Sequence, residues 1–402
     1  QLNSHAQIGV SITATSTNDS SSSATNDGGH GDSDTINRHS NYDQKVLMEQ
    51  VGSALGSEIK KLLPPMNKDG SSSSRFCCPL DEALVECIME RHNNNENKIA
   101  SLEEFNLPPY GIFPKGTGRT EIGSMQTAPL IHFFESLSQS SGLTLRFQKL
   151  RGHNGHHIVE SAFKAFSRSL RCFIDGTKRE DLEGMWGTSS DSATQGVEMK
   201  REGCVTRKTK ETGIKVNMAL DGGVGGVKVC TGVHTLDGLI REIAVESECM
   251  SLQVECQGDL WVDDHHTSED VSIAIGQVLN KALGSKAGLN RMWTASAEEG
   301  ASQVEVVMDL SNRPCFTHDL DLSHYNDEKI GDVSVEMIEH VFDSLVMNGQ
   351  MTVHIVQIKL GQSTKDLVTA AARAFGRALG KCIAVDPRRM GATASSKGTL
   401  SV

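Results

Sequence analysis

The chain has 402 residues, a formal net charge of −12 at pH 7 and 22% charged residues, which is long enough for two ordinary domains. The acidic balance and the lack of a long basic block argue against nucleic acid or an anionic membrane as a partner held by general electrostatics. No stretch approaches about eighteen consecutive apolar residues, so no membrane-spanning helix is expected. Ten cysteines without a CxxC pair indicate a reducing compartment.

Residues 1–44 are rich in Ser, Asn, Asp, Gly and Thr. A segment of this composition cannot bury enough apolar surface to offset the entropy lost on ordering, so we expect it to be disordered. A polar stretch at residues 66–75 is expected to be a loop. The folded part of the chain is therefore expected to begin near residue 45.

Apolar periodicity predicts alternating strands and helices along the rest of the chain. In the first half it predicts helices over residues 129–137 and 156–170 with a strand over 143–150 between them. In the second half it predicts strands over 212–220, 252–262, 304–310 and 351–358, and helices over 236–245, 265–283, 335–346 and 367–379. This order predicts sheets backed by helices on one face.

Three segments recur along the chain. Residues 131–137 match 339–345 at an offset of 208, residues 164–170 match 373–379 at an offset of 209, and residues 49–56 match 269–276 at an offset of 220. Self-similarity of this kind indicates a tandem duplication. We expect a disordered segment at 1–44, a first copy with a degenerate N-terminal part at 45–190 and a second copy at 204–402.

The motif His-His-x-x-Glu occurs at the start of two predicted helices. Residues three or four apart share one face of a helix, so the first His and the Glu of each motif lie together while the second His points elsewhere. A single such motif is more often a chance pair of surface histidines, whereas two with identical spacing predict a metal site. On ligand type alone, manganese, zinc and iron fit equally well. The motif residues are His156, His157 and Glu160, and His265, His266 and Glu269.

In these motifs and in several further segments, the chain resembles the imidazoleglycerol-phosphate dehydratase family. The further segments are residues 207–212, 220–222, 258–260, 276–277, 290–291 and 313–314 and, for the final part of the family pattern, 151–164 and 395–398. The resemblance covers nearly the whole chain beyond residue 44. It implies an α/β fold of the α+β type with tandem repeats of a sheet backed by helices on one face, the imidazoleglycerol-phosphate dehydratase or ribosomal-S5-domain-2-like fold. It also implies a homo-oligomer, because family members form a closed shell with metals between neighbouring subunits.

The resemblance implies a role for each candidate site residue. The expected cofactor is Mn²⁺, and the expected partner is a small-molecule phosphate substrate. Expected metal ligands are the six motif residues together with His132 and His340. Expected catalytic carboxylates are Glu211, Glu269 and Glu160. Expected phosphate-binding residues are Arg291, Arg313, Lys164, Ser396 and Lys397, with Arg373 standing in the second copy where the first has Lys164.

The departures from the family pattern are complementary. The first copy has Lys45 and Val46 where a first motif would begin, and the second copy has Lys365 and Asp366 where a second motif would begin. Gly238 replaces one further expected histidine ligand. Each copy keeps the motif that the other has lost, which favours one composite site. Independent decay of two halves is the alternative.

The expected activity is dehydration of imidazole glycerol phosphate to imidazole acetol phosphate at a dinuclear metal site, in histidine biosynthesis. The alternative is a catalytically weak structural or regulatory subunit that keeps the fold and a partial metal site. A generic metallohydrolase ranks last, because no further nucleophile or ligand pattern is present. Because the chain begins with Gln1, we expect N-terminal targeting information to be missing, with the cytoplasm or plastid stroma as the location.

Overall fold

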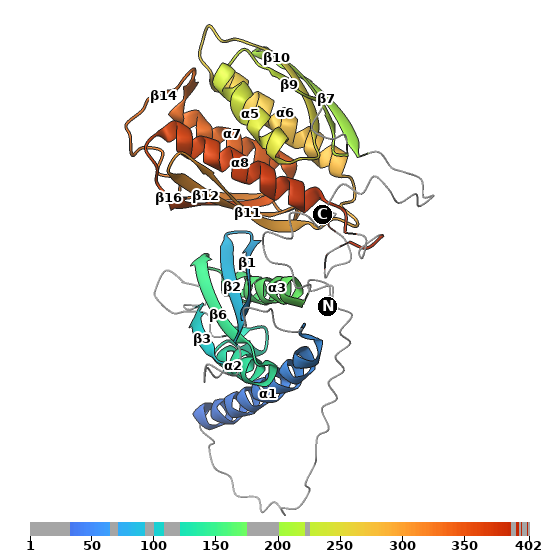
Figure 1. Cartoon of the computed structure of the whole chain (residues 1–402), viewed down its shortest axis with the longest axis vertical. Coiled ribbons are helices and arrows are strands. Elements are labelled where there is room, and N and C mark those ends of the chain that lie inside the picture. Colours follow the sequence, from blue (N-terminus) through green and yellow to red (C-terminus); the bar gives the residue numbers. More distant parts are fainter. Residues whose placement is uncertain are drawn as a thin grey trace, which may run out of the picture. The chain divides into compact units, whose positions relative to one another are not determined.

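The computed structural model describes residues 33–64, 71–92, 100–107, 121–174, 201–221, 226–386, 391–393, 395 and 400, with side chains from residue 44 onward. The chain divides into two compact units, which are considered separately (Figure 1). Unit 1 comprises Asn3–Phe76 and Val85–Glu183, and unit 2 comprises Cys77–Leu84 and Gly184–Val402. Among the helices described, none is both long and apolar enough to cross a membrane.

The described residues of unit 1 form a four-stranded sheet, a two-stranded hairpin and three helices. Its elements are α1 (Ser33–Leu62), β1 (Ser71–Leu80), β2 (Ala83–His92), β3 (Leu102–Asn106), β4 (Glu121–Ile122), β5 (Met125–Gln126), α2 (Leu130–Ser141), β6 (Thr144–Arg151) and α3 (Gly155–Ile174). The end of β1 and the start of β2, within Cys77–Leu84, are grouped with unit 2. The sheet order is β1-β2-β6-β3, and β3 runs parallel to β6.

Two expectations for this part of the chain need adjustment. Helix α1 begins at Ser33, inside the segment 1–44 that was expected to be disordered, while residues 1–32 lie outside the described part. Strand β1 begins at Ser71, inside the expected loop at 66–75. Its serines carry no apolar alternation, but the strand continues into Phe76, Cys77 and Cys78, which are buried.

Unit 2 contains two successive sheet-and-helix halves. The first half consists of β7 (Glu202–Lys208), β8 (Thr212–Ala219), β9 (Val227–Cys230), α5 (His234–Glu246), β10 (Ser251–Gly258) and α6 (His265–Leu283). The second consists of β11 (Met292–Glu299), β12 (Ser302–Asp309), β13 (Cys315–His318), β14 (Lys329–Ile330), β15 (Val333–Ser334), α7 (Val335–Gly349), β16 (Thr352–Lys359) and α8 (Thr364–Ile383).

The two halves of unit 2 share one topology. The sheet orders are β7-β8-β10-β9 and β11-β12-β16-β13, with the last two strands of each order parallel and the other pairs antiparallel. In Figure 1 the four helices form a layer between the two sheets. The predicted architecture of sheets backed by helices on one face is therefore confirmed.

The core of unit 2 follows from strand alternation. Ile214, Val216 and Met218 of β8 are buried, while Lys215 between them is exposed, as expected for a strand with one covered face. The apolar faces of α6 and α7 close the same core, and it continues into the second half through Val306, Ile355 and their neighbours.

Unit 1 corresponds to the second half of unit 2 preceded by one helix. Its order of α1, three strands, a small hairpin, α2, β6 and α3 matches that of α6 through α8, and its sheet order matches β11-β12-β16-β13. No counterpart of the sheet β7-β8-β10-β9 occurs among the described residues of unit 1.

A close helix contact supports this correspondence. A Cβ added at Gly276 of α6 would lie 2.7 Å from the carbonyl oxygen of Leu345 on α7, and one at Gly56 of α1 would lie 2.5 Å from that of Leu137 on α2. Gly56 and Gly276, like Leu137 and Leu345, are paired by the sequence repeat. Both helix pairs therefore approach each other at a position where only glycine fits without displacement.

Candidate functional site

The first candidate motif begins helix α6 in unit 2. The backbone N–H of His265 donates to Asp263 Oδ1 at 3.0 Å, which starts the helix at this residue. His265 Nε2 lies 3.7 Å from Glu269 Oε2, in agreement with helical spacing. The ring of His340, from α7, lies 5.5 Å from that of His265, measured between centroids. Two imidazoles and a carboxylate therefore gather at the start of α6.

The neighbouring His266 points in a different direction. Its Nδ1 lies 3.1 Å from Asp259 Oδ2, and its Nε2 lies 3.9 Å from Glu211 Oε1. The hydrogen bond with the Asp259 carboxylate is the main cause that raises the pKa of His266. A carboxylate that accepts from Nδ1 leaves Nε2 as the nitrogen available to a metal or substrate.

The second motif begins helix α3 in unit 1 and has the same construction. The N–H of His156 donates to Asn154 Oδ1 at 3.0 Å, and His156 Nε2 lies 3.3 Å from Glu160 Oε2. Lys164 Nζ lies 2.7 Å from Glu160 Oε1. The rings of His156 and His157 are 6.2 Å apart and nearly perpendicular. Each unit therefore contains one well-formed motif.

Glu211 is held at the turn between β7 and β8. Its backbone N–H donates to the Thr209 hydroxyl at 3.1 Å, and the neighbouring Thr212 hydroxyl donates to Asp270 Oδ2 at 2.6 Å. Arg207 also donates to this Asp270 oxygen at 2.5 Å. Because Asp270 follows Glu269 on α6, it ties the strand turn that carries Glu211 to the helix that carries the histidines.

The expected phosphate-binding cations have different environments. Arg291 is 6% exposed and forms a bidentate pair with Asp309 at 2.7 and 2.9 Å. Arg313 is partly exposed, and its Nε lies 3.4 Å from Asp81 Oδ1. Lys164 is the lysine that pairs with Glu160. Ser396 and Lys397 lie outside the described residues.

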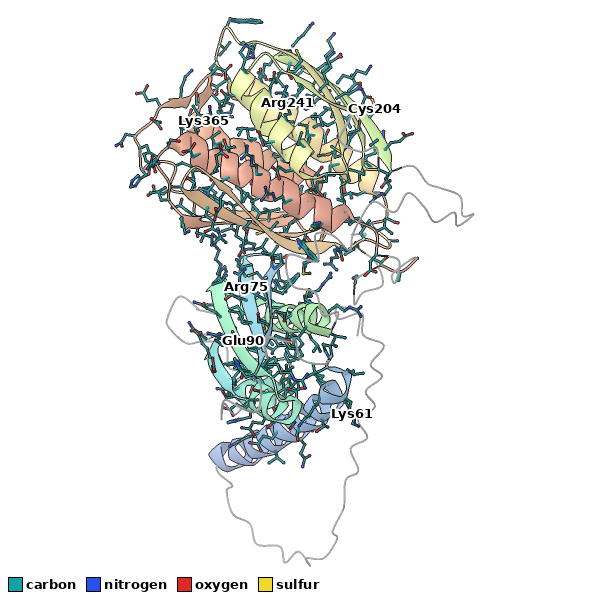
Figure 2. The ribbon with its side chains drawn as sticks, viewed as in Figure 1. Lys61, Arg75, Glu90, Cys204, Arg241 and Lys365 are labelled. Carbon is teal, nitrogen blue, oxygen red and sulfur yellow. The ribbon has the colours of Figure 1, made fainter. Side chains whose placement is uncertain are left out.

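The positions where motifs are missing carry contacts that are ordinary for helices. Lys45 and Glu49 of α1 form an exposed pair at 3.7 Å. On α8, where Figure 2 labels Lys365, the Ser363 hydroxyl accepts the N–H of Asp366 at 3.1 Å as a helix cap. Neither of these positions keeps the histidine pair of the motif.

Arg373, the second-copy counterpart of Lys164, is surrounded by carboxylates. Its Nε lies 2.9 Å from Glu242 Oε2 and 3.9 Å from Glu246 Oε1, and it also pairs with Glu299. The hydrogen bond with Glu242 is the main cause that raises its pKa. Its charge is neutralised within the fold.

The donors in each unit fit a metal by chemistry but do not complete a coordination sphere. Imidazole and carboxylate groups suit Mn²⁺ and Zn²⁺, yet no group of three or more His, Cys, Asp or Glu side chains in the described part of the chain is arranged to hold an ion. His132 of α2, an expected ligand in unit 1, pairs with Glu135 at 2.9 Å. Further ligands must join either motif to hold an ion.

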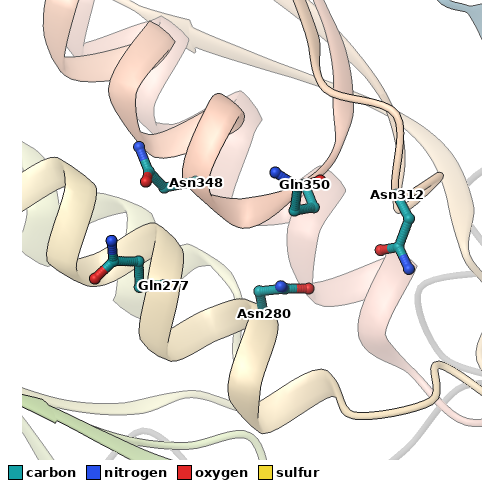
Figure 3. Close-up of a pocket in the computed structure, with 5 residues that line it drawn as sticks. All are labelled: Gln277, Asn280, Asn312, Asn348 and Gln350. Carbon is teal, nitrogen blue, oxygen red and sulfur yellow. The ribbon is translucent and has the colours of Figure 1, made fainter. Parts of the chain in front are cut away.

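A separate pocket lies at the other end of α6. It has a volume of about 430 Å³ and is lined by carboxamides, shown in Figure 3: Gln277, Asn280, Asn312, Asn348 and Gln350. Lys286, which is 2% exposed, donates to Asn312 and to the Gln350 carbonyl oxygen. The pocket contains none of the predicted site residues.

Sequence reasoning missed the acidic residues that orient the site. Asp259, Asp264 and Asp270 are 6–7% exposed, and each accepts a hydrogen bond from a neighbouring element. In the sequence, the only sign of their role is the high density of aspartates around the histidine pair. Such a density is also typical of a solvated helix start. Only the fold shows that Asp259 pairs with His266 on α6, Asp264 with Ser334 on β15, and Asp270 with Arg207 on β7 and Thr212 on β8.

Comparison with known proteins places these observations in a family. A sequence model described as imidazoleglycerol-phosphate dehydratase matches residues 31–170 and 231–379. A protein of Arabidopsis thaliana named imidazoleglycerol-phosphate dehydratase 1, chloroplastic, is 35% identical over 244 residues, covering 61% of this chain and 86% of the relative. An imidazoleglycerol-phosphate dehydratase of Prochlorococcus marinus strain NATL1A is 38% identical over 204 residues, 51% of this chain and 98% of the relative. A crystal structure of the Staphylococcus aureus dehydratase is 30% identical, covers 46% of this chain and 99% of that one, and has a TM-score of 0.41.

Proposed function

The chain belongs to the imidazoleglycerol-phosphate dehydratase family, and on this premise we propose that it is a hydro-lyase of histidine biosynthesis. The proposed reaction removes water from imidazole glycerol phosphate to give imidazole acetol phosphate. The observation that carries the proposal is that each unit retains one motif with the same hydrogen-bonded construction, His265 with Glu269 and His156 with Glu160. Each unit has also lost the motif that the other retains.

We infer that both motifs contribute to one dinuclear Mn²⁺ site. The proposed ligands are the motif histidines and glutamates, with His340 beside His265 and His132 as its counterpart. Either motif alone lacks enough donors, so the two must meet within a chain or between neighbouring chains. When bound, the metal would supply a Lewis acid that stabilises charge on the substrate's imidazole ring.

Glu211 is the proposed general acid–base. Dehydration requires a carboxylate that removes a proton from carbon next to the ring and a group that protonates the departing hydroxyl. Glu211 lies 3.9 Å from His266 Nε2 on a turn fixed through Thr209, Thr212 and Asp270. A catalytic base depends first on reach to the proton that it removes, and the position of Glu211 beside a proposed metal ligand supports this role. Glu160 and Glu269 are the proposed supporting carboxylates.

Arg313 is the most exposed of the described cations proposed to contact phosphate, Lys164 would have to be shared with Glu160, and Ser396 with Lys397 would complete the set. Arg291 would have to share its guanidinium with Asp309, to which it is bound in a buried pair. Arg373 is held by Glu242 and Glu299, so a phosphate at its position would have to compete with carboxylates already in place. The proposed phosphate site uses the first-copy lysine, which pairs with the carboxylate of Glu160, whereas Arg373 is surrounded by three carboxylates.

We further propose that the active species is a homo-oligomer that binds a small phosphate substrate and neither nucleic acid nor membrane. A closed oligomer repeats every intersubunit contact by symmetry, so one pairing of the motifs would build all sites at once. The Arabidopsis relative is named as chloroplastic, which supports the plastid stroma as the location if this chain has a plant-like source, with the cytoplasm as the alternative.

One observation favours a second candidate function, a catalytically weak structural or regulatory subunit. Gly238 on α5 stands where the family pattern has a histidine, and among the described residues no atom beyond its chain neighbours and its own helix backbone lies within 4 Å of a Cβ built there. No described side chain therefore fills the position of the lost ligand. Such a subunit would keep the fold and bind metal weakly.

Complementation of a histidine auxotroph that lacks the dehydratase decides between the two functions. Wild-type chain should restore growth without histidine, and Glu211→Gln should not. The purified protein should convert the substrate and lose activity on chelation. Failure to complement, together with a folded protein that binds Mn²⁺ but shows no turnover, would establish the subunit function instead.

A further inference from the structure

A two-stranded hairpin contacts the start of both helices in the first half of unit 2. In this β14–β15 hairpin, Asp332 accepts the backbone N–H groups of His234 and Thr235 at 2.6 and 2.8 Å and so caps α5. Gly331 has a φ of +63°, and a Cβ there would lie 2.4 Å from the Thr235 hydroxyl oxygen. The turn is therefore shaped to reach the helix.

Ser334, at the end of the same hairpin, holds the residue that precedes the histidine pair. Its backbone N–H and its hydroxyl both donate to the Asp264 carboxylate, each at 2.7 Å. Asp264 is 6% exposed. These two bonds fix its side chain against the hairpin, one residue before His265.

This use of Asp264 is unusual for its position in the helix. It is the N-cap residue of α6, where an aspartate side chain ordinarily accepts a backbone N–H of the first turn and contributes to helix stability. Its carboxylate makes no such bond. Asp263 accepts the N–H of His265 instead. The Asp264 carboxylate therefore serves to connect the helix start to β15.

Unit 1 contains the same connection at a helix that has lost its histidines. Gln44, which precedes Lys45 on α1, accepts the N–H of Gln126 at 2.8 Å and donates to the Ser124 carbonyl oxygen at 3.1 Å. Ser124 and Gln126 belong to the β4–β5 hairpin, the counterpart of β14–β15. Both units thus tie equivalent helices to the hairpin, through a neutral amide inside α1 in unit 1 and a charged, doubly bonded carboxylate at the start of α6 in unit 2.

We propose that Asp264 and Ser334 are positioning residues that hold the start of α6 so that His265 and His266 present their Nε2 atoms to a divalent metal. The inference rests on the metal site of the proposed function. A charge-assisted pair of bonds is stronger and more directional than the amide contact of unit 1. Outer-shell partners of metal ligands typically change metal affinity by about 10- to 100-fold.

The test measures Mn²⁺ binding to the full-length protein, with electron paramagnetic resonance to distinguish free from bound Mn²⁺. Thermal unfolding of each variant shows whether it is folded. Asp264→Ala should weaken binding by about 10- to 100-fold and broaden the bound-Mn²⁺ spectrum. Ser334→Ala should change the affinity and the spectrum in the same direction by a smaller factor. Ser334→Thr should keep the wild-type affinity and spectrum because it keeps the hydroxyl. Gln44→Ala is the matched control, which loses the equivalent contact of unit 1 and should leave Mn²⁺ binding unchanged.

Wild-type affinity and spectrum in folded Asp264→Ala and Ser334→Ala would overturn the inference and leave the proposed function intact. An equal loss of binding in Gln44→Ala would also overturn it, because the effect would then be general destabilisation. A wild-type protein that binds no Mn²⁺ would overturn the proposed metal site and the inference together.

Discussion

Two glycines in the middle of helices of unit 2 provide a test of how its helices pack. Gly238 on α5 has open space around a built Cβ, whereas a Cβ at Gly276 on α6 would lie 2.7 Å from Leu345 O and 2.8 Å from Gly349 N. Replacing glycine by alanine inside a helix favours the helix by about 1 kcal/mol. At Gly238 this gain is unopposed, so Gly238→Ala should stabilise unit 2 by roughly 0.5–1 kcal/mol.

At Gly276 the same gain meets steric overlap with the backbone of α7. Overpacking of this kind costs about 1–3 kcal/mol, so Gly276→Ala should be destabilising by up to about 2 kcal/mol after the helix gain is subtracted. For a unit of this size, 1 kcal/mol shifts the thermal midpoint by roughly 2–4 °C. Calorimetry of the two variants should therefore give midpoint shifts of opposite sign. If Gly276→Ala is as stable as Gly238→Ala, the close approach of α6 and α7 is wrong.

Four further predictions concern the site, the assembly and a buried charge. Gly238→His should tighten Mn²⁺ binding in titration calorimetry, because the open space admits an imidazole where the family pattern has one; weaker binding would contradict this. His156→Ala and His265→Ala should each lower the bound Mn²⁺ measured by elemental analysis, and an unchanged metal content in either would exclude the composite site. Light scattering should find a particle well above the 43.4 kDa chain, larger with Mn²⁺ than after chelation. Burial lowers the pKa of Lys286 to about 8, so the unfolded chain binds this proton more tightly than the folded chain. The free energy of unfolding measured in urea should therefore rise between about pH 8 and 10.5, and Lys286→Met should remove that rise.

The sequence was most informative where apolar periodicity was strong. The predicted helix at 265–283 coincides with α6, and the strand predicted at 212–220 ends one residue earlier, at Ala219. The strand predicted at 252–262 ends at Gly258, because Leu260, Trp261 and Val262 are exposed in the loop before α6. Their apolar character reads as a continued strand, although their side chains lie outside the core.

Helix α1 and the site's supporting contacts were harder to predict. α1 lies partly in a polar segment, and Gly52 and Gly56, which disfavour a helix by propensity, are positions where the backbone of α2 leaves no room for a Cβ. Tertiary packing therefore outweighs local preference there. For the site, helical spacing predicted that His265 and Glu269 share a face, but it carried no information on Asp259 or Ser334, which other elements bring to the motif. The ion pair between Arg291 and Asp309 was missed for the same reason.

Because the same helix contact occurs in both units, the two units can be compared within one chain. Gly56 with Leu137 and Gly276 with Leu345 preserve one packing geometry in two units whose site residues have diverged, as Lys45 and His265 illustrate. Positions that agree between the units report what the fold requires of any sequence. Positions that differ report where the fold tolerates change. A mutational scan of both units in one molecule would thus separate requirements of folding from requirements of catalysis under identical conditions of expression and assay.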